Sequence, residues 1–167
     1  MLGFFLEPFQ TSVRKRLRKA PKFYFFDGGI SRALAGQLDF LPKEGTSYFG
    51  IQFEAFIINE IFKANEYSRL RWKMNYLQTE ARVEIDLVLS KAGFEPIFIE
   101  IKSTTELRED HLKNLKHLQK EFPNSHFYCI SRDPHPQKFD AIEALPWQMF
   151  LQSPTYFNPR PSADPHP

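Results

Sequence analysis

An acidic pair and a lysine near the middle of the chain have the residue types and spacing of a metal-dependent phosphodiester site. Asp86 is followed fourteen positions later by Glu100, and Lys102 comes two residues after that glutamate. Mg²⁺, or Mn²⁺ in its place, suits such a pair, because Mg²⁺ takes one or two carboxylates and keeps waters and substrate phosphates as its other ligands. A lysine beside the metal can orient or help deprotonate the attacking water. Asp86 and Glu100 are therefore candidate metal ligands, and Lys102 is a candidate catalytic residue.

Two predicted strands carry these residues. Over residues 83–89, apolar side chains alternate with Glu84 and Asp86, which would place both acids on one face of a strand. Over residues 97–102, isoleucines alternate with Glu100 and the lysine that follows it, so these two also share a face. A tight turn separates the two runs, and we expect them to pair as a hairpin.

The register of this hairpin decides which charges meet. A register that opposes Asp86 to Glu100 would put Glu84 beside Lys102, but the sequence by itself does not fix that register. Three carboxylates and one amine on otherwise apolar strands are costly unless they have a use. The alternative interpretation is an exposed sheet face crossed by ion pairs.

Composition limits the class of protein. The 167 residues are enough for one compact domain, and 42% hydrophobic and 25% charged residues are typical of a globular chain. The net charge of +2 is too small to indicate a partner. A single cysteine, Cys129, excludes internal disulfides and thiolate zinc sites and fits a reducing cytoplasm. Glu7 and Pro8 interrupt the apolar opening, so we expect neither a signal peptide nor a membrane span.

The chain divides into three predicted parts. Residues 1–22 are expected to be a basic lead-in or linker, which is either a solvated segment or an arm that contacts phosphates. Its cations are Arg14, Lys15, Arg16, Arg18, Lys19 and Lys22. Residues 23–151 are expected to form the folded domain. Residues 152–167 contain five prolines and are expected to be a disordered tail.

Further elements are predicted around the hairpin. An apolar stripe predicts a helix over residues 48–64, with Glu54 at its edge, where the carboxylate either points outward or faces a site. Residues 23–26 predict a short buried strand. Residues 106–122 predict a second helix, and residues 127–130 a buried strand that runs parallel to the second strand of the hairpin, because a helix separates the two.

Lysine and arginine side chains on two of the predicted elements could hold a nucleic-acid backbone. Residues 69–76 alternate cations with apolar residues and predict a half-exposed strand ahead of the hairpin, which together would form an antiparallel meander. The helix over 106–122 carries further lysines on its polar faces. The candidate nucleic-acid contacts are Arg69, Arg71, Lys73, Lys113 and Lys116.

The same residues resemble a known superfamily. Glu54 on a helix, Asp86 on a strand and the run Glu100–Lys102 on the next strand resemble the PD-(D/E)XK nuclease-like proteins. More narrowly, four segments are similar, in order, to the uncharacterised domain at the C-terminus of many prokaryotic AAA+ ATPases. These segments are Pro21–Gly29, Gly50–Glu60, Val83–Asp86 and Ile99–Lys102.

The resemblance implies a restriction-endonuclease-like core, which is an α/β fold with a central mixed sheet flanked by helices in the order αβββαβ. It implies that Asp86 and Glu100 bind the metal, that Lys102 serves the water and that Glu54 lies nearby and assists the metal. No P-loop pattern occurs in the sequence. An ATPase would therefore be a separate chain, or this sequence is a shortened form, which the likeness of residues 2–19 to the linker after the ATPase favours.

Two hypotheses follow from these observations. The first is a Mg²⁺-dependent nuclease that hydrolyses DNA phosphodiester bonds, and the complete set of Asp86, Glu100 and Lys102 favours it. The second is a non-catalytic module, derived from the C-terminal domain of an AAA+ ATPase, that binds nucleic acid or a protein. The modest net charge and the absence of an ATPase module from this sequence favour the second hypothesis.

Overall fold

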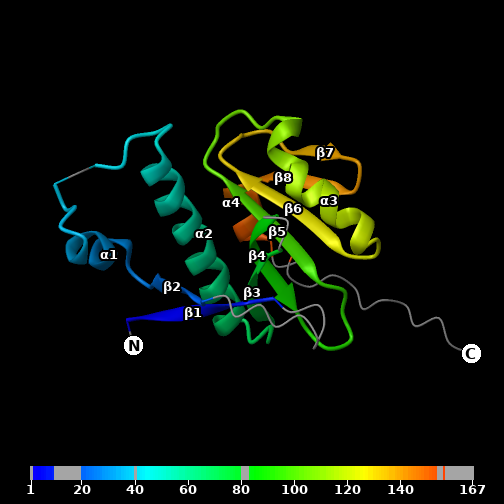
Figure 1. Ribbon diagram of the computed structural model, residues 1–167, viewed down its shortest axis with the longest axis horizontal. Helices are drawn as coiled ribbons and strands as arrows, with labels where there is room; N and C mark the ends of the chain where they lie inside the picture. Colours follow the sequence, from blue (N-terminus) through cyan, green and yellow to red (C-terminus); the bar gives the residue numbers. More distant parts are fainter. Residues whose placement is uncertain (1, 10–19, 40, 80–82, 154–155, 157–167) are drawn as a thin grey trace, which may run out of the picture.

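The computed structural model describes residues 2–9, 20–39, 41–79, 83–153 and 156. These residues form one eight-stranded sheet with helices packed on both of its faces (Figure 1). The strands are β1 (Gly3–Pro8), β2 (Lys22–Phe25), β3 (Lys73–Gln78), β4 (Glu84–Ser90), β5 (Ile97–Lys102), β6 (His126–Ser131), β7 (Gln137–Phe139) and β8 (Ile142–Pro146). The helices are α1 (Gly28–Leu34), α2 (Ser47–Tyr67), α3 (Lys113–Glu121) and α4 (Trp147–Gln152), with a 3₁₀ turn, η1 (Glu109–Leu112), ahead of α3.

The sheet is mixed, and its spatial order is β2-β1-β3-β4-β5-β6-β8-β7. Strands β3, β4 and β5 form the predicted antiparallel meander. Strand β6 follows α3 and runs parallel to β5, as predicted. The elements from α2 to β6 therefore follow the order αβββαβ, and the prediction of an α/β fold with a mixed sheet flanked by helices is confirmed.

Two apolar layers hold the helices to the sheet. On one face, Phe53, Ile57 and Ile61 of α2 pack against Ile99 of β5 and its neighbours. The predicted helix over 48–64 is confirmed, and it begins after Thr46, whose hydroxyl accepts a hydrogen bond from the Phe49 N–H at 3.2 Å. On the other face, three buried leucines of η1 and α3 cover a second layer with Phe98 and Phe127. These leucines are Leu112, Leu115 and Leu118.

The expectation that residues 1–22 precede the folded domain is wrong for Gly3–Pro8. Gly3–Pro8 forms β1, which pairs with β2 on one side and with β3 on the other. Phe4 and Leu6 are buried in the α2-side layer, because alternate side chains of this strand face the core. The cations at positions 14–19 lie outside the described residues, as do positions 154, 155 and 157–167 of the predicted tail.

Strand β2 is an edge strand rather than the buried strand predicted for residues 23–26. Tyr24 is buried, whereas Phe23 on the other face is 41% exposed. The short helix α1 follows it and ends close to Gly36, whose φ of 65° is one that glycine adopts readily. No side chain of α1 is buried among the described residues. In Figure 1, α1 lies at the opposite side of the molecule from α3.

The basic strand predicted over residues 69–76 begins only at Lys73. Arg69 and Arg71 have φ angles of 50° and 61°, which lie in the left-handed region and cannot continue a strand. These two residues form the turn after α2, where the Arg69 N–H donates to the Glu66 carbonyl. Alternation alone did not reveal this turn, because the sequence there contains neither glycine nor proline.

Strand β4 contains a bulge at the candidate site. Asn75 pairs with Val88, but Leu77 pairs with Ile85, so β4 has one residue more than β3 between these pairs. As a result, Ile85 and Val88 both pack in the α3-side layer, and Leu87 packs in the α2-side layer. The strict alternation predicted for this strand therefore breaks at Asp86, between Ile85 and Leu87.

Candidate active site

The structure brings Asp86, Glu100 and Lys102 together on neighbouring strands. Leu87 of β4 is paired with Ile99 of β5, a register that places Asp86 opposite Glu100. At this point the backbone pairing gives way to a side-chain contact, in which the Ile101 N–H donates to Asp86 Oδ2 at 2.7 Å. Lys102 Nζ donates to Glu100 Oε1 at 2.6 Å. Two carboxylates and one ammonium therefore converge where β4 and β5 separate.

Glu54 approaches the same cluster from α2. Its Oε1 accepts a hydrogen bond at 2.8 Å from the hydroxyl of Tyr24, which is buried on β2. Burial and the Glu54 carboxylate together raise the pKa of Tyr24, so the tyrosine remains a donor to Glu54. The hydrogen bond fixes one carboxylate oxygen of Glu54, and no described residue donates to the other.

Glu84 has a different partner from the one that the register had suggested. Its Oε1 lies 2.6 Å from Nζ of Lys22, on β2, instead of beside Lys102. The Lys22 ammonium also lies 5.0 Å from the centre of the Tyr76 ring. Burial lowers the pKa of Lys22, but the acids Glu84 and Glu54 outweigh it, so the net shift is upward.

Sequence reasoning missed Lys22 and Tyr24 as neighbours of the site. Both belong to β2, which pairs with β1 and is separated from β4 by two strands, β1 and β3. A signal was present, because Lys22, Tyr24 and Phe26 are alternate residues and so share one face of a strand. Nothing in the sequence showed that this face would meet Glu54.

The electrostatics of the acidic pair are unfavourable in the metal-free protein. Burial raises the pKa of Asp86 well above its ordinary value, and the carboxylates of Glu100 and Glu54 raise it further. Burial also raises the pKa of Glu100, although Lys102 opposes the shift. Burial lowers the pKa of Lys102, and the Glu100 carboxylate reverses that effect, so the pKa of the ammonium is raised overall.

The donor set fits a hard divalent cation. Glu100 is 3% exposed, and its Oε2 is buried without a hydrogen-bond partner among the described residues. A buried carboxylate oxygen with no donor is uncommon, and a metal ion is one way to satisfy it. Within the described part of the chain, no group of three or more His, Cys, Asp or Glu side chains could hold a metal. Mg²⁺ needs only one or two carboxylates with water and phosphate, so Asp86 and Glu100 suffice.

Three of the five predicted nucleic-acid contacts lie at the other end of the meander. Lys73 is paired with Ser90, four residues beyond Asp86 on β4, which is ~14 Å along the strand. Arg69 and Arg71 precede Lys73 in the turn after α2 and lie near the same end. The structure therefore does not bring these cations to the carboxylates.

The other two candidate nucleic-acid contacts, Lys113 and Lys116, lie on α3. Lys113 is exposed, and Lys116 donates to Glu109 and lies 4.0 Å from Asp140. In the described part of the chain, neither lysine pairs with Asp86, Glu100 or Lys102. Cys129 is paired with Glu100 across the β5–β6 ladder and is buried, and burial raises the pKa of its thiol, which suits a core residue.

Fold and site together define an α/β domain with a conspicuous cluster of carboxylates where two central strands separate. A family model described as "Domain of unknown function (DUF4143)" matches residues 49–150. The chain belongs to this family. The matched residues run from α2 to α4 and contain Glu54, Asp86, Glu100 and Lys102.

Two curated proteins are similar to this chain. The uncharacterized proteins Mb2031c of Mycobacterium bovis and Rv2008c of Mycobacterium tuberculosis are each 30% identical to it over 100 residues, or 60% of this chain. The match spans 22% of the length of each relative.

A solved structure is also similar, a refined half-complex from a tetradecameric assembly of Thermococcus gammatolerans McrB AAA+ hexamers with bound McrC. The similarity has a TM-score of 0.42 and 17% identity, and it covers 58% of this chain and 27% of the other. Within the described part of this chain, no helix has the length and apolar character needed to cross a membrane.

Proposed function

We propose that this domain is a Mg²⁺- or Mn²⁺-dependent nuclease that hydrolyses phosphodiester bonds in DNA. The observation that carries the proposal is the convergence of Asp86, Glu100 and Lys102, with a buried Glu100 oxygen that has no hydrogen-bond partner among the described residues. Carboxylates that raise each other's pKa are costly, and such groups concentrate at functional sites. A purely structural ion pair between Glu100 and Lys102 would be more stable without the repulsion from the Asp86 carboxylate.

Each residue has a distinct proposed role. Asp86 and Glu100 would hold the metal, which supplies charge stabilisation at the phosphoryl oxygens and a more acidic water. The Ile101 N–H orients the Asp86 carboxylate, and Lys102 is held at Glu100, where its ammonium can orient the attacking water or stabilise the charge that develops on phosphorus. Glu54, fixed by Tyr24, stands beside these ligands and assists the metal.

We also propose that the domain works with an AAA+ ATPase. The support is the resemblance of four sequence segments to domains that follow such ATPases, together with the length of the curated relatives, of which the match spans 22%. Because the chain contains no P-loop pattern, the nucleotide-hydrolysing module would lie on a partner or on a part of the protein beyond this sequence.

The direct test is cleavage of single-stranded, duplex and branched DNA with Mg²⁺ or Mn²⁺, by the wild type and by Asp86→Asn. The expected result is metal-dependent cleavage that Asp86→Asn abolishes. Glu143→Gln, which changes a half-buried glutamate on β8, is the matched control and should cleave like the wild type. If the wild type binds DNA but cleaves none of these substrates with either metal, the non-catalytic binding module becomes the better function.

A further inference from the structure

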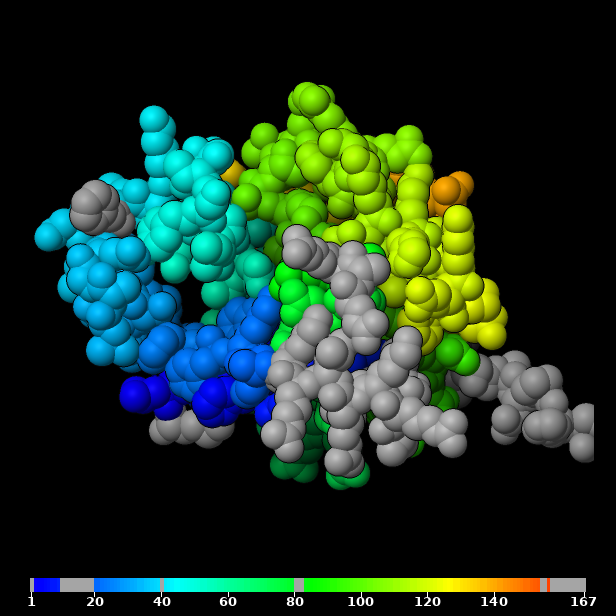
Figure 2. Space-filling model, viewed as in Figure 1, coloured from blue at the N-terminus to red at the C-terminus, as the bar shows by residue number. Residues whose placement is uncertain are grey.

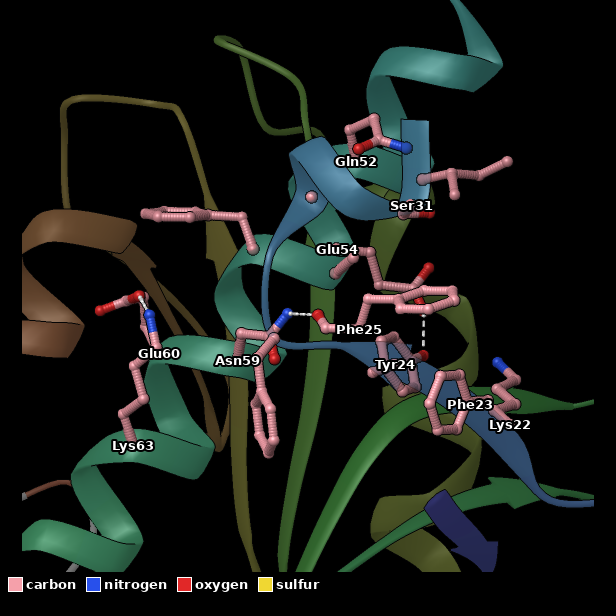
Figure 3. Close-up of a pocket in the computed structure, with 15 residues that line it drawn as sticks. Lys22, Phe23, Tyr24, Phe25, Ser31, Gln52, Glu54, Asn59, Glu60 and Lys63 are labelled. Carbon is pink, nitrogen blue, oxygen red and sulfur yellow. Dashed lines mark hydrogen bonds and ion pairs between the residues drawn. The ribbon is translucent and has the colours of Figure 1, made fainter. Parts of the chain in front are cut away.

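A cavity of about 640 Å³ lies beside the acidic cluster, between β2, α1 and α2 (Figure 3). It has the size of a small-molecule site. In Figure 2, α1 and the loop that follows it stand out as a lobe on the left of the molecule, with a hollow between this lobe and the body. Glu54 and Lys22 line the cavity, and both also face the carboxylate cluster. The cavity and the candidate active site are therefore adjacent.

The cavity walls are aromatic and partly open. Phe23 is 41% exposed and Phe56 is 42% exposed, so ring surface is available for contact. Phe25 stands beside Phe23, with ring centres 4.9 Å apart in an edge-to-face arrangement. Ser31 of α1 and Gln52 of α2 add a hydroxyl and an amide to the lining. The lining thus combines aromatic surface and neutral hydrogen-bonding groups with two sets of charges. The Lys22 ammonium and the Glu54 carboxylate lie on the side of the acidic cluster, and the other charges form the Glu60–Lys63 ion pair.

The ligand that matches this lining is a neutral planar ring attached to a phosphate. Bases of single-stranded nucleic acid stack on aromatic side chains whatever their sequence, and their edges form hydrogen bonds with hydroxyl and amide groups. Bases within a duplex are stacked on one another and cannot enter such a cavity without being extruded. We infer that the cavity holds an unstacked base of single-stranded DNA, next to the phosphate at the carboxylate cluster. This inference rests on the proposed function.

Gly28 allows the cavity to be filled without removing a contact. It lines the cavity at the start of α1, and a Cβ at this position would meet only the Gln52 side-chain oxygen, at 3.6 Å. Gly28→Leu should therefore place its side chain between α1 and α2, and leucine also favours a helix more than glycine does. The variant should fold at least as well as the wild type and exclude the base.

The experiment compares two oligonucleotides of equal length, one of thymidine nucleotides and one composed of abasic sites, by fluorescence anisotropy with a chelator present to prevent cleavage. The wild type should bind the thymidine strand about tenfold more tightly than the abasic strand, as expected for stacking of one base. Gly28→Leu should bind both strands equally, with the affinity that the wild type has for the abasic strand. Equal preference for the thymidine strand in Gly28→Leu and the wild type would overturn the inference.

Phe23→Ala and Phe5→Ala form a matched pair. The two phenylalanines are directly paired across β1 and β2, with ring centres 4.9 Å apart, but only Phe23 lines the cavity. Phe23→Ala should lose most of the preference for the thymidine strand, and Phe5→Ala should keep it. If Phe5→Ala loses as much, the bases bind the outer aromatic surface, and the cavity is not the site.

The two proposals fail in different ways. Wild-type protein that prefers the thymidine strand through Gly28 and Phe23 but never cleaves DNA would overturn the nuclease function and leave the base site standing. Cleavage that depends on Asp86, with no difference between thymidine and abasic strands, would overturn the base site alone. If Gly28→Leu binds and cleaves a blunt duplex like the wild type, this result supports a role of the cavity that is limited to single strands.

Discussion

Two aspartates show how differently one fold treats an acidic side chain. Asp133, which follows β6, is buried, and its carboxylate accepts from the N–H groups of Leu107 and His135 and from the Gln137 amide, at 2.9 to 3.0 Å. These hydrogen bonds lower the pKa of Asp133. Asp86 accepts from one donor among the described residues, the Ile101 N–H, and it faces other carboxylates. Burial and this repulsion raise the pKa of Asp86.

The difference separates a structural acid from a functional candidate. The ionised form of Asp133 is stabilised by three donors, so its charge supports the folded loop after β6. The ionised form of Asp86 is disfavoured in the absence of a cation, so its charge reduces stability. A carboxylate that costs stability is best explained by a ligand that uses the charge.

The largest expected effect is on metal binding. Asp86→Asn and Glu100→Gln should each abolish binding of Mg²⁺ or Mn²⁺, because each removes one of the two proposed anionic ligands. Asp133→Asn should leave metal binding unchanged, since this aspartate is part of another hydrogen-bond network. Isothermal titration calorimetry measures all three, and unchanged binding in both site variants would place any metal elsewhere.

The next largest effect is on turnover. Lys102→Ala should keep DNA binding and lower the cleavage rate by ~10²-fold or more, because the ammonium acts on the water or on charge that develops at phosphorus. Single-turnover cleavage at saturating enzyme separates rate from affinity. A variant that cleaves normally and only binds more weakly would reduce Lys102 to a contact with the DNA backbone.

Stability should respond to the two aspartates with opposite signs. Asp133→Ala should lower the free energy of unfolding by about 2–4 kcal/mol, since it leaves buried N–H donors without an acceptor. Asp86→Asn should preserve or raise stability without metal, because the amide oxygen still accepts from the Ile101 N–H and the repulsion is gone. Urea unfolding with a chelator present measures both, and equal destabilisation would erase the contrast between the two acids.

The pH dependence of stability should differ in the same way. The pKa of Asp133 is lower in the folded state, so its contribution is present above the unfolded value of about 4 and is lost as pH falls through the folded value. The pKa of Asp86 is raised in the folded state. Its contribution to stability is therefore most favourable below the unfolded value of about 4, and it declines as pH rises through the folded value. Urea unfolding from acidic to neutral pH measures the free energy of unfolding of each variant. Compared with the wild type, Asp133→Asn should lose less stability as pH falls, and Asp86→Asn should lose less stability as pH rises toward neutral. If Asp133→Asn changed the stability near neutral pH and Asp86→Asn changed it at acidic pH, the comparison would be contradicted.

The smallest effect concerns single cations. Lys22, beside the carboxylate cluster, should contact phosphate, so Lys22→Ala should reduce the salt dependence of DNA binding by about one unit. Lys73→Ala removes the same charge at the other end of the meander and should change the salt dependence less. Anisotropy titrations over a range of salt concentrations measure both slopes. An equal loss in the two variants would show that the DNA follows the whole length of the strands.

The sequence by itself determined the elements that depend on local pattern. Alternating isoleucines predicted β5, the apolar stripe with Phe53 and Ile57 predicted α2, and the helix after β5 predicted the parallel direction of β6. The spacing of Asp86, Glu100 and Lys102 selected residues that the fold does bring together. These inferences succeeded because each depends on residues that are close in sequence, within one helix or within two successive strands.

Tertiary structure decided what local pattern does not encode. The bulge at Asp86 is visible only in the pairing of β4 with β3, and it interrupts an alternation that looked regular. The positive φ angles of Arg69 and Arg71 removed two cations from a strand that their spacing had predicted. The bulge depends on how distant segments pair, and alternation within one segment carries no information about that pairing. The turn is held by hydrogen bonds between Asn65 and Trp72, which alternation does not reveal either.

The same reason explains why β2 was absent from the predicted site. Tyr24 reaches Glu54 across 30 positions of sequence, and Lys22 reaches Glu84 across 62. These contacts exist because β1 places β2 at the edge of the sheet, with the α2 face of β2 turned toward the carboxylates. The sequence determined which groups can perform chemistry, and the long-range pairing of strands decided which of them stand next to one another.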